Sequence, residues 1–135
     1  MVMKAGPLVE AIESRRRAGS TVLLTSPRGR PFTQAMAETL AGREQLLVLC
    51  GHSEGVDERV IEQFVDIEVS IGDYVLTGGD IPDRGIIDSA SRLVHGVLGR
   101  AQTAGSGAFA GGPVGDRALT GTPECRGWAL GNSAA

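Results

Sequence analysis

The stretch VSIGDYVLTGG, from Val69 to Gly79, decides the fold, because it joins strand-forming residues to tight turns and a loop suited to a ligand. Ile71 and its apolar neighbours supply the bulk of a buried strand. Gly72, Gly78 and Gly79 mark points where the backbone turns sharply or lets another group approach closely. The residues therefore predict a strand, a ligand-binding loop and a further strand. Their glycine spacing fits neither the dinucleotide fingerprint nor the P-loop, which argues against a nucleotide phosphate.

Composition indicates one globular domain with an aliphatic core. The chain has 135 residues, of which 41% are hydrophobic, 21% are charged and only 4% are aromatic. Its net charge of -3 and pI near 5.3 argue against a strongly electrostatic nucleic-acid binder, DNA-binding proteins included. Any contact with RNA must be local, and the basic clusters at residues 15–17 and at Arg28 and Arg30 are the candidates. The cluster at 15–17 is equally well explained as a solvated helix end.

Cysteine usage and hydropathy indicate a protein of the cytoplasm. Cys50 and Cys125 form no C-x-x-C pair, and the two histidines complete no recognised zinc spacing with them, so we expect free thiols and no metal. No apolar run reaches the length of a membrane span, and the first residues lack the order of a signal peptide. We therefore expect a cytoplasmic protein without a membrane partner.

Helix and strand signals alternate along the chain. They predict helices at residues 7–17, 34–40 and 57–64, and a fourth from residue 86 that ends near Gly99. They predict strands at residues 21–26, 45–50, 67–71 and 74–77, with a turn at 27–30. Such alternation is typical of an α/β domain with a mainly parallel sheet and flanking helices. Residues 100–121 are rich in glycine and alanine, which predicts a flexible linker.

Three motifs carry a resemblance to a known family. They are SIGDYVLTGG followed by Asp80-Ile81-Pro82, LTSPRGR at residues 24–30, and CGHSEGVDER at residues 50–59. In this order they resemble the bacterial tRNA (guanine-N1)-methyltransferase family of the SPOUT superfamily, strongly over residues 1–99 and weakly after that. The resemblance implies a knotted S-adenosylmethionine-binding α/β domain at 1–99, with a trefoil knot near the cofactor, and a linker with a C-terminal remnant at 100–135. It also implies that the family's first strands and helical C-terminal domain are absent, as in a truncated member, a fragment or a mis-started reading frame.

The resemblance assigns a cofactor site. Glu54 resembles the acidic residue that faces the methionine amino group, while His52 and Ser53 stand where the family has arginine and tyrosine. The alternative is that the glycines only make tight turns. The residues that the resemblance assigns to S-adenosyl-L-methionine are Leu24, Thr25, Ser26, Pro27, Gly51, Glu54, Gly55, Ile71, Gly72, Asp73, Tyr74, Val75, Leu76, Gly78 and Gly79.

The resemblance also implies a reaction and its partners. The family methylates N1 of the guanine on the 3′ side of the anticodon, position 37 of the tRNA, so the expected partners are the tRNA anticodon stem-loop and a second copy in a homodimer. Removing the N1 proton needs a base, and a fixed cation stabilises the developing charge. Arg92 matches the family's arginine, although a surface pair with Asp88 would also explain it. Gly107 replaces the family's linker aspartate, which leaves Asp116 as candidate base. The alternative is a non-catalytic module that binds cofactor or dimerises.

Overall fold

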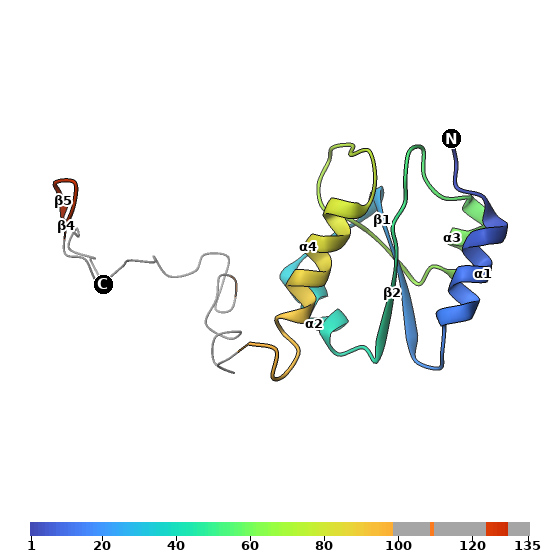
Figure 1. Ribbon diagram of the computed structural model, residues 1–135, viewed down its shortest axis with the longest axis horizontal. Helices are drawn as coiled ribbons and strands as arrows, with labels where there is room; N and C mark the ends of the chain where they lie inside the picture. Colours follow the sequence, from blue (N-terminus) through green and yellow to red (C-terminus); the bar gives the residue numbers. More distant parts are fainter. Residues whose placement is uncertain (99–108, 110–123, 130–135) are drawn as a thin grey trace. The chain divides into compact units, whose positions relative to one another are not determined.

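The computed structural model describes residues 1–98, 109 and 124–129, which fall into two compact units, Met1–Ala104 and Gly105–Ala135. The predicted linker at 100–121 lies outside the described residues except for Phe109. The second unit contains an antiparallel pair of short strands, β4 (Glu124–Cys125) and β5 (Trp128–Ala129). The elements of the first unit are α1 (Ala5–Arg15), β1 (Ser20–Pro31), α2 (Gln34–Ala41), β2 (Gln45–Leu49), α3 (Glu58–Phe64), β3 (Ile67–Ser70) and α4 (Asp80–Ser91) (Figure 1).

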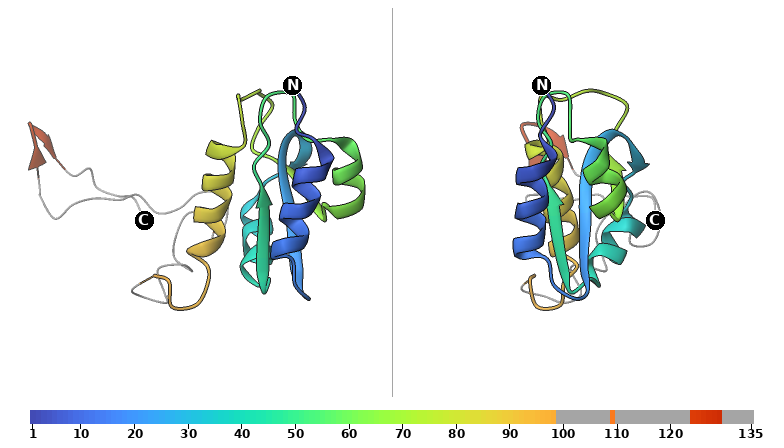
Figure 2. Two further views of the ribbon diagram at one scale, coloured as in Figure 1. Left: turned by 45° about the vertical axis from the view of Figure 1, so that its right-hand side comes forward. Right: turned by 90° about the vertical axis from the view of Figure 1, so that its right-hand side faces the viewer.

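The first unit is a three-stranded parallel sheet in the order β2-β1-β3. Helices α1 and α3 cover one face and α2 and α4 cover the other (Figure 2). Successive residues of the central strand β1 serve the two faces, because side chains alternate along a strand: Val22 packs with Ile12 of α1, and Leu23 packs with Leu40 of α2 and Ile86 of α4. The predicted α/β class with a mainly parallel sheet is confirmed.

Local signals set most of the element ends. The Thr33 hydroxyl accepts a hydrogen bond from the Met36 amide at 3.2 Å and caps α2, and Gly42 is the C-cap at its other end. The Asp57 carboxylate accepts one from the Arg59 amide at 2.9 Å and starts α3. Gly19, with φ +83°, turns the chain from α1 into β1, where a side chain would be strained.

The predicted turn at residues 27–30 lies inside β1 as an excursion from the ladder. Thr25 pairs with Val69 of β3, and so does Arg30, so residues 26–29 leave the sheet and return to the same partner. A Cβ on Gly29 would lie 2.4–2.6 Å from the Val69 backbone, so only glycine permits this approach. The prediction was right about the bend and wrong about the end of the strand.

The predicted strand at residues 74–77 is wrong. After β3 the Ser70 hydroxyl accepts a hydrogen bond from the Gly72 amide and donates one to the Gly72 carbonyl, at 3.2 and 3.0 Å, which turns the chain out of the sheet. Residues 71–77 then run without regular structure, and Val75 is 82% exposed. Tyr74, Val75 and Thr77 have the composition of a strand, but among the described residues the pairing here amounts to an isolated bridge between His52 and Gly78.

The predicted fourth helix starts too late and ends too far along the chain. Helix α4 begins at Asp80 because Pro82 suits a first turn and the acidic residues Asp80 and Asp83 favour a helix N-terminus. It ends at Ser91, and Gly96 then adopts φ +84°, which no helix interior contains. Within the described residues, no helix combines the length and the apolar character needed to cross a membrane.

Candidate functional site

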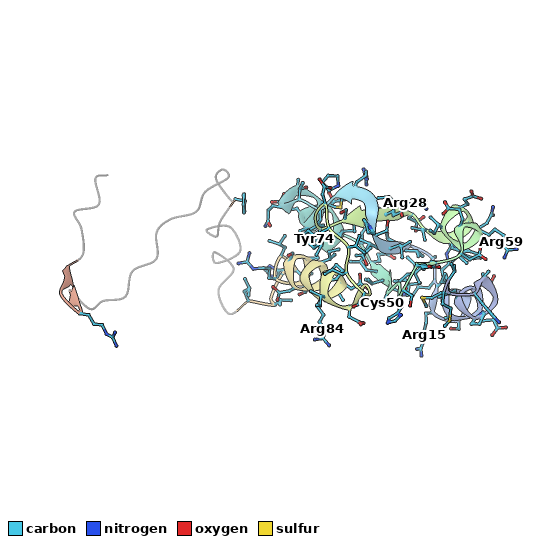
Figure 3. All side chains as sticks on the ribbon, turned by 90° about the horizontal axis from the view of Figure 1, so that it is seen from above. Arg15, Arg28, Cys50, Arg59, Tyr74 and Arg84 are labelled. Atoms are coloured by element: carbon cyan, nitrogen blue, oxygen red, sulfur yellow. The ribbon has the colours of Figure 1, made fainter. Side chains whose placement is uncertain are left out.

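A cavity of about 620 Å³ lies where the excursion of β1 and the loops after β2 and β3 meet the first turn of α4. This is the carboxyl end of the parallel strands, where open α/β sheets hold their ligands. Figure 3 looks onto this end, with Arg28, Cys50 and Tyr74 coming from three different segments. The predicted cofactor residues that line the cavity are all of those assigned above except Asp73: Leu24, Thr25, Ser26, Pro27, Gly51, Glu54, Gly55, Ile71, Gly72, Tyr74, Val75, Leu76, Gly78 and Gly79.

Backbone hydrogen bonds join two of these loops. The Gly79 amide donates to the Gly51 carbonyl at 2.7 Å, and the Ser53 amide donates to the Thr77 carbonyl at 3.0 Å. A Cβ on Gly78 would lie 3.2 Å from the Gly51 carbonyl oxygen and 3.3 Å from the His52 ring. The glycine therefore lets the two loops meet, and a larger residue there would push apart two walls of the cavity.

The rim of the cavity is acidic. Arg28, from the excursion of β1, donates to Glu58 of α3 at 2.6 Å and to Glu68 of β3 at 3.0 Å, and the Glu68 hydrogen bond is the main reason that its pKa is raised. Ser26 donates to the same Glu68 oxygen at 2.7 Å. With Glu54, the lining holds three carboxylates and one guanidinium, a net charge of -2. Such a rim attracts a cation and repels a phosphate.

A cluster that sequence reasoning missed lies behind the cavity wall, with Thr25 and Asp83 buried and Cys50 and Asp80 exposed. Thr25 donates to Asp83 Oδ1 at 2.7 Å, and Asp83 is only 6% exposed. The Cys50 thiol donates to Asp80 at 3.0 Å and also faces Asp83. Burial raises the pKa of Asp83; burial and the two carboxylates raise the pKa of Cys50 to about 12. An aspartate in the first turn of a helix usually interacts with the helix dipole, so its burial had no signal in the sequence.

Of the two predicted catalytic residues, only Arg92 is described, and it is not part of the cavity lining. Arg92 follows the last residue of α4, whose twelve residues span about 18 Å from the cavity end. It is half-buried, and no ion pair joins it to Asp88, although its amide donates to the Asp88 carbonyl at 3.2 Å. Asp116 and Gly107 lie outside the described residues. In the described part of the chain, no three His, Cys, Asp or Glu side chains are grouped to hold a metal.

Comparison with known proteins matches nearly the whole chain. A family model described as tRNA (Guanine-1)-methyltransferase TrmD matches residues 1–132. The chain belongs to this family. The three sequence stretches singled out above lie in the matched region and form the wall of the cavity.

Individual members of the TrmD family are similar in sequence but about twice as long. A tRNA (guanine-N(1)-)-methyltransferase of Anaeromyxobacter sp. (strain Fw109-5) is 54% identical over 113 residues, 82% of this chain and 45% of that protein. One of Citrifermentans bemidjiense is 48% identical over 129 residues, 94% of this chain and 52% of that protein. One of Dehalococcoides mccartyi is 42% identical over 133 residues, 96% and 54% respectively. The chain spans about half the length of the curated relatives it matches.

Proposed function

We propose that this chain is an S-adenosylmethionine-dependent tRNA methyltransferase that methylates N1 of the guanine on the 3′ side of the anticodon. The observation that carries the proposal is the cavity at the carboxyl end of the sheet, formed by the three motifs of a TrmD family member. We further propose a trefoil knot near this cavity, a cytoplasmic location, and the tRNA anticodon stem-loop as the macromolecular partner.

The residues present fit the cofactor. The cavity volume of about 620 Å³ lies within the usual range for small-molecule sites, roughly 300–1,000 Å³. Its net charge of -2 suits a ligand that carries a sulfonium and an ammonium, and Glu54 at the rim would face the ammonium. When bound, S-adenosylmethionine would supply an electrophilic methyl group. The chain's own residues would hold it, exclude water and orient the guanine.

Methylation of guanine N1 requires a base that accepts the N1 proton and a cation that stabilises the developing negative charge. N1 of neutral guanine carries a proton, so a carboxylate such as Asp116 would accept it, and Arg92 would stabilise negative charge on the base. Because Arg92 lies at the far end of α4 from its own cavity, we propose a homodimer in which the partner's Arg92 would approach the cavity of this chain. Exposed apolar side chains on and beyond α4 support such an interface: Ile81, Ile87, Val94 and Val97.

Binding and transfer are tested separately. Titration calorimetry with S-adenosylmethionine and S-adenosylhomocysteine measures binding, and no heat at millimolar ligand would reject the cofactor. A tritiated-methyl assay uses unmodified tRNA with guanine after the anticodon, and the same tRNA with adenine there as control. Transfer that collapses in Asp116→Asn identifies the base, since such a group contributes about 10²–10⁴-fold. Transfer that appears only in Gly107→Asp identifies the missing carboxylate. Cofactor binding without transfer in either chain supports the non-catalytic alternative.

The proposed homodimer is tested by light scattering. At tens of micromolar chain, we expect the mass of two copies, because a specific interface of ordinary size holds at this concentration. An Ile87→Glu substitution on the exposed face of α4 should shift the mass to that of one copy, and Glu62→Gln on α3 is the matched control. A single copy in the unaltered chain would reject the dimer.

A further inference from the structure

Three segments of the cavity wall converge on one side chain that is itself outside the cavity. The segments are β1 at Thr25, just before its excursion, the loop after β2 at Gly51, and Gly79 before α4. Thr25 donates to Asp83 Oδ1 at 2.7 Å. A Cβ on Gly79 would lie 2.9 Å from Thr25 Oγ1, 3.1 Å from the Gly51 nitrogen and 3.2 Å from Asp83 Oδ2. Thr25 therefore contacts the buried Asp83 carboxyl directly, Gly79 lies against it, and the loop after β2 reaches it through the Cys50 thiol.

The surroundings of Asp83 disfavour its charged form. Its Oδ2 atom is buried and has no hydrogen-bond partner among the described residues. The groups that face it are the Thr25 hydroxyl from β1, the Cys50 thiol after β2, and the Asp80 carboxylate from its own helix. In the described part of the chain, no ion pair reaches it. A buried carboxylate without a cation, beside a second carboxylate, is unfavourable, so an uncharged carboxyl suits this position.

We propose that Asp83 is a positioning residue of the cavity, whose buried carboxyl group holds the wall segments at Thr25 and Gly79, and through Gly79 the loop at Gly51, in register from behind. Its role toward the cofactor rests on the proposed function; its role toward the loops does not. The carboxyl accepts the Thr25 hydrogen bond and fills the space behind Gly79, while the Gly79 amide donates to the Gly51 carbonyl at 2.7 Å. Loss of the carboxyl leaves the Thr25 hydroxyl buried without an acceptor and a void behind the two glycines.

The test compares three variants of the full chain. Asp83→Ala removes the carboxyl, and Asp83→Asn keeps its shape and its acceptor oxygen without the ability to ionise. Asp88→Asn makes the same chemical change on the exposed side of the same helix and is the matched control. The first readout is hydrogen exchange of the Gly79 amide by NMR, with the Leu23 amide in the centre of β1 as internal reference. The second is the affinity for S-adenosylhomocysteine by calorimetry.

We expect Asp83→Ala to accelerate exchange at Gly79 about tenfold relative to Leu23 and to weaken binding about tenfold, equivalent to about 1.4 kcal/mol. Asp83→Asn and Asp88→Asn should stay close to the unaltered chain in both readouts. Unchanged exchange at Gly79 in Asp83→Ala overturns the proposal, and so does Asp83→Asn behaving like Asp83→Ala, because the uncharged form would then not suffice. If the unaltered chain binds no S-adenosylhomocysteine, the cofactor proposal fails, and the exchange measurement still decides the role of Asp83.

Discussion

Replacing Gly29 by alanine should destabilise the first unit strongly, although it adds a single methyl group. The new Cβ would lie 2.4–2.6 Å from the nitrogen, Cα and carbonyl carbon of Val69, whereas ordinary contacts are 3.4–4 Å. The atoms in the way belong to the backbone of β3, so no side-chain rotation relieves the overlap. Overpacking of this kind costs about 1–3 kcal/mol. We expect the upper part of this range, because the excursion of β1 and the backbone of β3 must move apart at Val69, the residue with which Thr25 and Arg30 both pair.

Urea denaturation followed by circular dichroism measures the loss, and thermal melting should show a fall of about 4–8 °C for each kcal/mol. Gly85→Ala is the matched control, since a Cβ there meets nothing within 4 Å and Gly85 lies inside α4. It should raise the unfolding free energy by about 0.5–1 kcal/mol, because alanine is the better helix former. A Gly29→Ala chain as stable as the unaltered one would show that β1 and β3 are not as close as the structure has them.

Three further predictions concern a cap, a titration and a thiol. Thr33→Ala removes the acceptor for the Met36 amide and should lower the unfolding free energy by about 1 kcal/mol in urea titrations, whereas Thr33→Ser should restore it. The pKa of the Asp83 carboxyl is raised in the folded chain. Its contribution to the unfolding free energy is therefore largest below the pKa of the unfolded chain, about 3.9, and is lost as the pH rises through the pKa of the folded chain. The stability of the unaltered chain relative to Asp83→Asn should therefore fall as the pH rises above about 4, and parallel curves would contradict this. A Cys50 pKa of about 12 should slow its alkylation by iodoacetamide at pH 8 by about two to three orders of magnitude against a free cysteine, as resolved from Cys125 by peptide mass spectrometry. Alkylation at the ordinary rate would mean that the thiol does not face the two carboxylates.

The elements that the sequence predicts well are those whose ends carry their own chemistry. Thr33 and Gly42 bracket α2, and the apolar run that begins at Gln45 gives β2 almost to the residue. The strand expected at 74–77 fails because strand formation depends on a partner as well as on β-branched residues, and the turn at Ser70 and Gly72 takes the chain out of the sheet. Helix α4 starts early because Asp80 and Pro82 favour a first turn that the apolar periodicity from Ile86 did not reveal.

The cavity lining follows the motifs closely, because they form the excursion of β1 and the loops after β2 and β3, which parallel strands bring together at one end of the sheet. The sequence did not reveal contacts between motifs. Arg28 meets Glu58 and Glu68 across 30 and 40 positions of the chain, and Thr25 meets Asp83 across 58. The resemblance supplied Arg92 and Asp116, and the described residues leave Arg92 at the opposite end of α4 from the cavity.

In β1 the number of residues in the strand is independent of the register of its side chains, although the two are usually coupled. Thr25 and Arg30 both pair with Val69. The pairing with β3 therefore fixes where residues 26–29 leave the sheet and where they rejoin it, but it does not fix how many residues lie between these two points. Residues could be inserted or deleted among 26–28 without shifting any side chain of the core to the other face of the sheet, provided that glycine stays against Val69. This segment carries Arg28 and part of the cavity rim. The shape of the rim can thus vary between homologues or engineered variants while the sheet beneath it keeps its register.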